Sequence, residues 1–352
     1  MITFYMFIDN LKKIDNEPNK KQLEIIEPGA DTSFFIVAGP GSGKTAVLTA
    51  RILKLIFVDG VDPSGILATT FTRKAAGELR SRILGRGFAL QDLLLKDKNL
   101  KKEEKEWIEG LDINQLITGT IDGICEEVLR GYREPGTLPP VLVDEFVFNT
   151  VLLREGLFKK GRYRNDDLYH FIAQLKGSKW GINIGTKVET LKEIWARRYN
   201  DQVNWRKFVD DGASEGNIAL QVIDEALEDY KCAMESRNMM DFTMLEQQVL
   251  EKLKQGKLSE FTDGLRVIMV DEYQDTNLLQ ESIYFELVKN SGASLMVVGD
   301  DDQSLFRFRG TAVELFVEFP DRFKERFGIS PEIVFLTTNY RSTKNIIDFV
   351  NC

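Results

Sequence analysis

The residues best suited to chemistry are those of AGPGSGKT, residues 38–45. They follow an apolar run at 33–38 and precede a helical pattern at 46–56, the strand–turn–helix context that a phosphate-binding loop requires. Glycines permit backbone angles that a Cβ forbids, so the turn can point its N–H groups at a phosphate. The alternative is a glycine-rich turn with an exposed lysine. The candidate phosphate-binding residues are Gly39, Pro40, Gly41, Ser42, Gly43, Lys44 and Thr45.

Two pairs of side chains carry the predicted chemistry. Lys44 can reach the β- and γ-phosphates of a nucleotide, and the Thr45 hydroxyl can bind Mg²⁺. Asp271 follows the apolar run 266–270 and is the expected second metal partner. Glu272 beside it can accept a proton from an attacking water. Adjacent carboxylates also occur in solvated turns, but a phosphate-binding loop upstream favours catalysis.

Three further candidates follow other predicted strands. Gln303 comes after the apolar run 294–298 and is a candidate sensor of the γ-phosphate. Arg309 and Arg341 are candidate cations for the charge of a transition state, with surface salt bridges as the alternative.

The elements that must position these residues form an α/β pattern. Continuous apolar runs are typical of parallel strands covered on both faces, and ligands bind at the carboxyl ends of such strands. We expect residues 1–13 to pack on the core as a short element, and the lysine-rich residues 86–116 to form a solvated helical excursion. The predicted strands are 33–38, 65–72, 116–120, 266–270, 294–298 and 332–336, and the predicted helices are 19–26, 46–56, 73–83 and 121–132.

From about residue 139 to 240 the pattern changes to helices with few strand signals. The clearest case is 219–234, where apolar residues recur at three- and four-residue spacing. We interpret this block as an inserted helical domain. Residues 159–207 carry twelve cations and five anions, a net +7, interleaved with Trp180, Trp195 and Trp205. This stretch is either a nucleic-acid surface or a solvated helical face.

Composition narrows the possible classes of protein. A length of 352 residues suggests two or three domains. One histidine excludes a histidine-dependent triad or a zinc site, and three separated cysteines fit a reducing cytosol. No apolar run approaches a membrane span, and the first residues lack the basic leader of a signal peptide. The expected location is cytoplasmic.

Four longer motifs follow AGPGSGKT in order: ILATTFTRKAAGELRSRI at 66–83, VDEYQDTN at 270–277, VVGDDDQSLFRFRG at 297–310 and LTTNYRS at 336–342. Together they resemble the motor motifs of UvrD/Rep-type superfamily 1 DNA helicases. The resemblance implies the N-terminal half of an ATP-driven motor with 3′-to-5′ movement on single-stranded DNA or DNA junctions, and with ATP and Mg²⁺ as cofactors. It gives no protein partners.

The resemblance also implies a domain plan. A RecA-like P-loop ATPase domain would comprise residues 1–135 and 241–336, interrupted by a helical subdomain at 136–240. Residues 337–352 would begin a second motor domain, most of which we expect to be missing from this chain. That expectation predicts slow ATP turnover and no unwinding by the chain on its own.

Individual roles carry over only where the motifs match. Gln22 resembles the glutamine that reads adenine, Tyr340 the residue that stacks on it, and Arg341 a γ-phosphate ligand. Gln303 resembles the coupling glutamine, and Arg309 a residue between nucleotide and DNA. The positions where the family stacks DNA bases correspond to Phe71, Phe242, Phe306 and Phe308, for which core packing is the alternative.

The chain departs from the family at several positions. Ile121 and Asp122 stand where the family commonly has phenylalanine and histidine, which puts that DNA contact in doubt. Phe308 replaces a frequent tryptophan, and Ala46 replaces a frequent arginine. The rival to a motor is a truncated ATP-dependent DNA-binding or regulatory module. A small-molecule kinase is a further rival, but it would not explain Phe306 and Phe308.

Overall fold

The computed structural model describes residues 2–15, 17–133, 136–177, 181–300 and 313–343. The chain divides into two compact units. The first comprises residues 1–124, 253–276 and 284–352, and the second comprises 125–252 and 277–283. The second unit is thus wider than the inserted stretch 136–240 expected from the sequence, and that domain plan stays a prediction.

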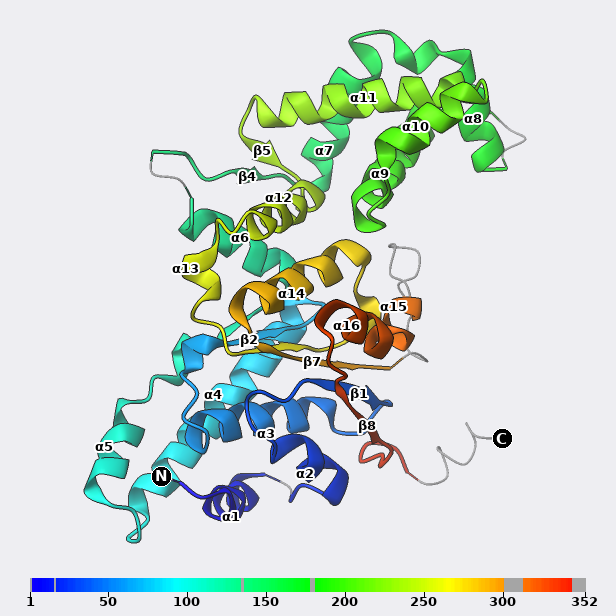
Figure 1. Ribbon diagram of the computed structural model, residues 1–352. Coiled ribbons are helices and arrows are strands. Elements are labelled where there is room, and N and C mark those ends of the chain that lie inside the picture. Colours follow the sequence, from blue (N-terminus) through cyan, green and yellow to red (C-terminus); the bar gives the residue numbers. More distant parts are fainter. Residues whose placement is uncertain (1, 16, 134–135, 178–180, 301–312, 344–352) are drawn as a thin grey trace. The chain divides into compact units, whose positions relative to one another are not determined.

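A six-stranded sheet forms the centre of the first unit (Figure 1). The order is β3-β2-β6-β7-β1-β8, and every neighbouring pair is parallel. The strands are β1 (Phe34–Ala38), β2 (Ile66–Thr69), β3 (Ile117–Gly119), β6 (Val267–Val270), β7 (Ser294–Gly299) and β8 (Glu332–Leu336). The predicted α/β class with a parallel sheet is therefore confirmed, and each expected strand is present.

Sixteen α-helices lie in the part of the chain that the structure describes. They are α1 (Phe4–Ile14), α2 (Lys20–Ile26), α3 (Lys44–Phe57), α4 (Arg73–Lys96), α5 (Lys102–Gly110), α6 (Ile121–Gly131), α7 (Glu145–Val151), α8 (Asp166–Leu175), α9 (Ile184–Asn200), α10 (Trp205–Ser214), α11 (Ile218–Glu235), α12 (Phe242–Lys254), α13 (Ser259–Thr262), α14 (Leu278–Ser291), α15 (Val313–Val317) and α16 (Phe319–Phe327). Short 3₁₀ turns occupy Pro63–Gly65, Ile113–Gln115, Arg162–Arg164 and Tyr273–Asp275, and a π-helical turn occupies Leu152–Phe158.

Alternate side chains of each strand face opposite layers of the first unit. On β1, Phe34 and Ile36 join the core formed with α1 to α5. Phe35 points the other way, where its ring centroid lies 4.7 Å from Phe316 and 5.7 Å from Phe319. Both sides of the sheet are thus covered, which is why its strands read as unbroken apolar runs. Figure 1 shows α3 and α4 on one side of the sheet and α16 on the other.

The expectation of a solvated excursion at 86–116 is wrong in part. Helix α4 continues to Lys96, and Leu90 and Leu94 on it are fully buried. Ile108 on α5 is buried in the same core. The charged residues of this stretch cover one face of each helix, while a sparse apolar set at helical spacing packs inward.

The second unit has its own apolar core. Helix α11, predicted from its spacing, contributes Ile223, Leu227 and Tyr230 to it. A two-stranded parallel pair, β4 (Val141–Leu142) and β5 (Met239–Met240), joins the two ends of the helical block, so the block is nearly but not wholly helical. Among the residues that the structure describes, no helix is both long and apolar enough to cross a membrane.

Candidate nucleotide site

The turn from β1 to α3 has the backbone that a phosphate requires. Gly41 and Gly43 have positive φ angles of 77° and 86°, a conformation that glycine adopts without the cost of a Cβ. Helix α3 begins at Lys44, and its N-cap residue Gly43 supplies no side-chain hydrogen bond. The helix start therefore keeps its partial positive charge available for an anion. The Ser42 hydroxyl is buried here with no hydrogen-bond partner among the described residues.

The candidate metal ligand Asp271 and the candidate base Glu272 meet this turn from the end of β6. Lys44 Nζ lies 3.0 Å from Glu272 Oε2, although the two residues are 228 positions apart. Glu272 has a φ of 55°, an unusual backbone for a non-glycine residue. Its backbone N–H donates to Asp271 Oδ1 at 3.0 Å. The structure thus brings Lys44, Asp271 and Glu272 together at the carboxyl end of the sheet.

Sequence reasoning missed Gln274 as a site residue. Its Nε2 donates to Glu272 Oε2 at 2.7 Å, and its Oε1 accepts from the backbone N–H of Asp300 at 3.1 Å. A Cβ on Gly299 would lie 2.5 Å from Gln274 Oε1, so glycine at the end of β7 allows this approach. Gln274 therefore fixes the Glu272 carboxylate relative to β7. A polar residue inside VDEYQDTN was the available signal.

Burial dominates the electrostatics of the acidic residues. Loss of solvation, reinforced by the charge of Glu272, raises the pKa of Asp271 to about 7 in spite of the opposing charge of Lys44. The same causes raise the pKa of Asp275 to about 6. A buried carboxyl of this kind favours its ionised form only when a cation is close.

The residues present fit a magnesium ion. Thr45 and Asp271 offer a hydroxyl and a carboxylate at the phosphate-binding turn, and Mg²⁺ in nucleotide sites is held by one or two protein oxygens plus phosphates and water. Among the described residues there is no cluster of three or more His, Cys, Asp or Glu side chains suited to a metal.

Asp271→Asn is expected to stabilise the nucleotide-free protein by about 1–4 kcal/mol at pH 8. The folded pKa of about 7 exceeds the usual value of 3.8, so the folded state holds an extra proton between these limits. The stability that this proton contributes is fully present below about pH 3.8 and is lost as the pH rises through 7. The advantage of asparagine should therefore grow from about pH 4 to 7 and then stay constant.

Thermal unfolding from pH 4 to 9 with a metal chelator measures this prediction. Asp92→Asn, on the exposed face of α4, is the matched control and should change little. A stability difference for Asp271→Asn that does not vary with pH would contradict the assigned burial.

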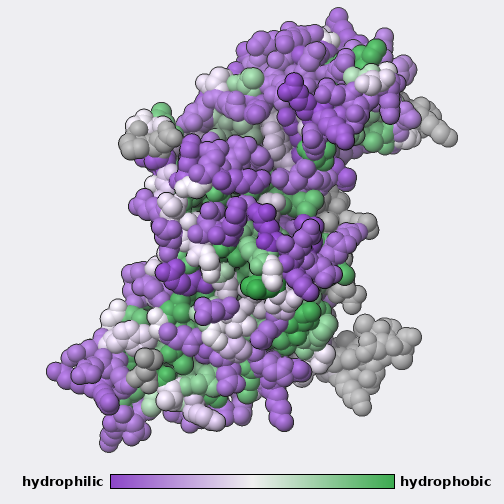
Figure 2. All heavy atoms as spheres, in the orientation of Figure 1, coloured by the Kyte–Doolittle hydropathy of each residue, from purple (hydrophilic) through white to green (hydrophobic). Residues whose placement is uncertain are grey.

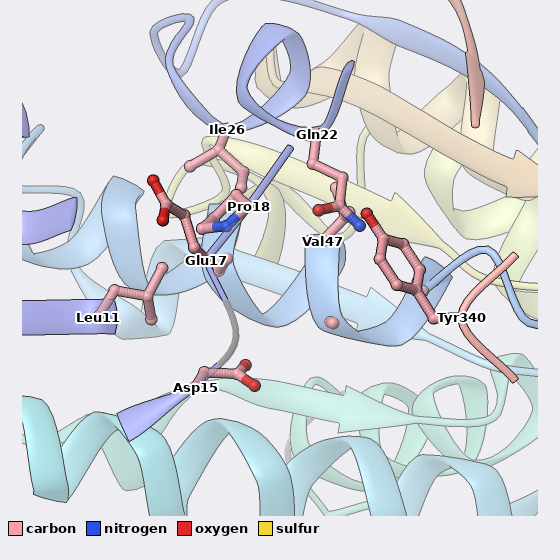
Figure 3. A pocket seen from close by; sticks show the side chains of 11 residues that line it. Leu11, Asp15, Glu17, Pro18, Gln22, Ile26, Val47 and Tyr340 are labelled. Atoms are coloured by element: carbon pink, nitrogen blue, oxygen red, sulfur yellow. The ribbon is translucent and has the colours of Figure 1, made fainter. Parts of the chain in front are cut away.

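A pocket beside the turn has a size and lining suited to a base. Its volume is about 120 Å³, and its walls include Leu11, Gln22, Val47 and Tyr340 (Figure 3). In Figure 3 the Gln22 amide and the Tyr340 ring lie next to each other on one side of the pocket. Gln22 is buried, whereas Tyr340 is 57% exposed. The carboxylates of Asp15 and Glu17 also line the pocket. A mostly apolar pocket with a few polar groups is typical of sites for small ligands such as a purine.

Asn19 holds these two walls together. Its Oδ1 accepts from the Gln22 backbone N–H at 2.9 Å, and Gln22 Oε1 accepts from the Asn19 N–H at 3.0 Å, which makes a capping box on α2. Asn19 Nδ2 also donates to the Tyr340 hydroxyl at 2.5 Å. The helix cap thereby orients the Gln22 side chain.

Arg51 on α3 is a second residue that sequence reasoning missed. It is fully buried, and its guanidinium donates to the carbonyls of Ile25, Pro28 and Gly29 at 2.6–3.0 Å. Burial lowers its pKa to about 10. These bonds connect the loop after α2 to α3. They therefore stabilise the helix that carries Gln22 relative to the helix that starts at Lys44. A basic residue in the middle of a largely apolar helical stretch was its only signal.

Of the remaining predicted site residues, only some lie at the phosphate-binding turn. Tyr340 and Arg341 lie directly on the phosphate-binding turn, since Tyr340 N donates to Gly41 O at 2.8 Å. Phe71 is half-buried after β2, and Phe242 at the start of α12 is 41% exposed. The predictions for Gln303, Phe306, Phe308 and Arg309 lie outside the described residues.

The hypothesis of an aromatic, basic surface at 159–207 is wrong for its described tryptophans. Trp195 and Trp205 are 1% and 8% exposed. Their indole N–H groups donate to Asp241 at 2.9 Å and to Asp224 at 2.6 Å. These rings fill the core of the second unit, where they cannot stack on bases. Trp180 lies outside the described residues.

The cations of this stretch are also largely neutralised. Arg162 is buried between Glu225 and Asp229, and Lys187 is buried with its amine on the Tyr163 carbonyl. Further ion pairs join Lys159 to Glu155, Lys176 to Glu193, Lys192 to Glu145 and Arg198 to Glu228. The surface over α9, α10 and α11 is mostly hydrophilic (Figure 2). The solvated helical face is therefore the better interpretation.

Comparison with known proteins agrees with the geometry of the first unit. The chain is 28% identical over 347 residues to the ATP-dependent DNA helicase UvrD1 of Mycobacterium tuberculosis. This alignment covers 95% of the present chain and 38% of the relative. It is 29% identical over 338 residues to DNA helicase II of Escherichia coli, covering 95% and 39%. ATP-dependent DNA helicase PcrA of Staphylococcus epidermidis is 27% identical over 342 residues, covering 95% and 39%.

The chain thus spans about two fifths of the length of these relatives. The family description "UvrD/REP helicase N-terminal domain" matches residues 18–324, which include the phosphate-binding turn and both carboxylates. Three observations lead to the same family: the motifs, the parallel sheet and the match over most of the chain. The chain belongs to the UvrD/REP helicase N-terminal domain family.

Proposed function

We propose that this chain is the N-terminal motor part of a cytoplasmic DNA helicase or translocase that binds and hydrolyses ATP to move 3′-to-5′ on single-stranded DNA. The observation that carries the proposal is the meeting of Lys44 with Glu272 and Asp271 at the carboxyl end of a parallel sheet. The relatives' printed names, ATP-dependent DNA helicase and DNA helicase II, support ATP and DNA as ligands.

The proposed chemistry uses the groups at this edge of the sheet. Lys44 leaves Glu272 to bind the β- and γ-phosphates, which frees the Glu272 carboxylate to accept a proton from the attacking water. Gln274 keeps that carboxylate oriented while Lys44 is away. Magnesium, when bound with the nucleotide, neutralises phosphate charge, and Thr45 and Asp271 hold it. In this proposal Gln303 senses the γ-phosphate, Arg341 binds it, and Arg309 offers a cation between the nucleotide and the DNA.

The DNA side of the proposal rests on aromatic side chains. Phe71, Phe242, Phe306 and Phe308 each stack on a base of single-stranded DNA or of a junction, a contact that tolerates any sequence. The 41% exposure of Phe242 at the start of α12 supports this role for that residue. In the proposed domain plan, 1–135 and 241–336 form the ATPase domain, 136–240 the inserted subdomain, and 337–352 the start of a second motor domain.

The hydrogen bonds of Asp241 hold the start of α12, where Phe242 lies. Asp241 immediately precedes Phe242, and its carboxylate accepts from Trp195, Tyr230 and the backbone N–H of Met244 at 2.8–2.9 Å. These bonds anchor the first turn of α12, so Phe242 projects from a rigid base. Stacking on a fixed ring costs less conformational entropy than stacking on a mobile one.

Glu272→Gln is expected to keep ATP affinity within about threefold while lowering DNA-stimulated hydrolysis by about 10²–10⁴-fold in a complete motor that contains this chain. Glutamine preserves the shape of the side chain and its contact with Gln274 but removes the proton acceptor. ATP titration and steady-state turnover with single-stranded DNA measure both effects.

The matched control is Glu325→Gln on the exposed surface of α16, which should change neither quantity. Retained turnover in Glu272→Gln would remove Glu272 from the proposed mechanism. The rival function, an ATP-dependent DNA-binding or regulatory module without motor activity, predicts that wild type itself binds ATP and DNA but never translocates along a DNA track.

A further inference from the structure

The side chain of Asn339 bonds the turn at residues 339–342 to the phosphate-binding loop. Asn339 Nδ2 donates to the Pro40 carbonyl at 3.0 Å. The other end of the same amide, Oδ1, accepts from the backbone N–H groups of Arg341 and Ser342 at 2.8 and 2.9 Å. Asn339 therefore both shapes the 339–342 turn and joins it to a loop some 300 residues earlier in the chain.

The 339–342 turn packs so closely on Gly41 that no side chain would fit between them. A Cβ on Gly41 would lie 2.7 Å from both Arg341 Cβ and Asn339 Oδ1. Gly41 also has a φ of 77°, so two separate reasons require glycine there. The backbone N–H of Tyr340 completes the contact by donating to Gly41 O at 2.8 Å.

In the bonds between the two segments, the 339–342 turn donates and the phosphate-binding loop accepts. The 339–342 turn binds carbonyl oxygens of the phosphate-binding loop, whereas a phosphate needs its N–H groups. The two interactions are therefore compatible. On the far side of the turn, the Tyr340 hydroxyl accepts from Asn19, which caps the helix that carries Gln22. The contact thus extends from the phosphate side of the site to the base side.

We propose that Asn339 is a positioning residue that holds Tyr340 against the base pocket and Arg341 beside the phosphate-binding loop before a nucleotide arrives. The proposal rests on the proposed nucleotide function of the same site. Preformed contacts of this kind reduce the entropy that a ligand must pay for on binding. The motif NYRS pointed only to Tyr340 and Arg341, and the asparagine gains its role from the contacts described here.

The effect of Asn339 should fall on the base side. Loss of its side chain removes the bond to Pro40 and the two bonds that shape the turn carrying Tyr340 and Arg341, so both residues become less well positioned. Gly39–Lys44 and the start of α3 keep the N–H groups that bind phosphate. Asn339→Ala should therefore raise the Kd for ATP about threefold to tenfold or more, the usual effect of losing one or two hydrogen bonds. The Kd for inorganic tripolyphosphate, which has no base for Tyr340 to contact, should rise less than the Kd for ATP, because only the contribution of Arg341 is lost.

The test titrates the 352-residue chain with ATP and with tripolyphosphate in the presence of Mg²⁺. Asn99→Ala, an equal truncation at an exposed position in the loop between α4 and α5, is the matched control and should leave both Kd values unchanged. Hydrogen exchange of the amides of residues 340–342 provides a readout without nucleotide and should accelerate in Asn339→Ala only.

The outcomes separate this inference from the proposed function. Equal weakening of ATP and tripolyphosphate, unchanged ATP binding, or tighter ATP binding in Asn339→Ala would each overturn the positioning role. Unchanged exchange at 340–342 would show that Asn339 does not hold the turn. Failure of the wild-type chain to bind either ligand would instead overturn the proposed function, and the exchange measurement would still decide whether Asn339 fastens the turn.

Discussion

Lys44→Ala is expected to weaken binding of ATP with Mg²⁺ by about a hundredfold, because hydrogen bonds to charged groups contribute about 1.5–3 kcal/mol each. The Lys44 amine is 3.0 Å from Glu272 and only 12% of its side chain is exposed. The amine is therefore held at the phosphate-binding turn, where a phosphate would offer it a second anionic partner. Isothermal titration of the purified chain measures the loss.

The fold should survive this substitution. Lys44 is the first residue of α3, and that helix is held by the buried core around Leu48, Ile52 and Leu55 rather than by its first side chain. Circular dichroism should therefore be unchanged. Lys98→Ala, at an exposed position after α4, removes the same charge elsewhere and should bind ATP as wild type does. Unchanged affinity in Lys44→Ala would show that the loop at 38–45 is not the nucleotide site.

A polypeptide of these 352 residues is expected to bind ATP but to hydrolyse it about 10³–10⁵ times more slowly than a complete motor of the family, the usual cost of a missing arginine finger. The family resemblance implies that hydrolysis takes place between two RecA-like domains. This chain spans about two fifths of its relatives and offers one described candidate arginine, Arg341, on the turn beside Gly41. Unwinding by this polypeptide should be undetectable, because translocation needs two domains that close on the nucleotide in turn.

Two assays on the purified polypeptide test this expectation. The first measures ATP hydrolysis with and without single-stranded DNA, and the second measures displacement of a labelled strand from a duplex with a 3′ overhang. Gel filtration must establish that the sample is a monomer, since a second copy could supply an arginine. Strong DNA-stimulated turnover by a monomer would mean that the groups described here complete the site by themselves.

Local patterns were enough to predict the framework of the site. The three glycines around Pro40 and Ser42 permit backbone turns that other residues disfavour, and the apolar runs on either side specify strand and helix by their periodicity. The parallel sheet followed from runs such as 267–270, which are apolar at every position because both faces are covered. The rule that ligands bind at carboxyl ends then placed Lys44 and Asp271 at one edge.

Tertiary structure decided which way the amphipathic side chains point. Trp195 and Trp205 lie in a basic stretch, yet each ring is buried with its N–H on an aspartate from elsewhere in the chain. Charge counted along the sequence ignores those distant partners, so it overestimated the basic surface at 159–207. The same limit explains residues 86–116, where abundant lysines concealed the few buried positions, Leu90 and Leu94 among them, that attach α4 to the core.

The contacts that make the site a unit were also invisible in the sequence. Lys44 meets Glu272, Gln274 meets Asp300, and Asn339 meets Pro40 across separations of 228, 26 and 299 residues. The sequence by itself determined the residue types at each strand end, since backbone conformation and burial pattern are encoded locally. Only the folded chain decided which of these ends touch, because hydrogen bonds between distant segments depend on strand order and on glycines such as Gly41 and Gly299 that allow close approach.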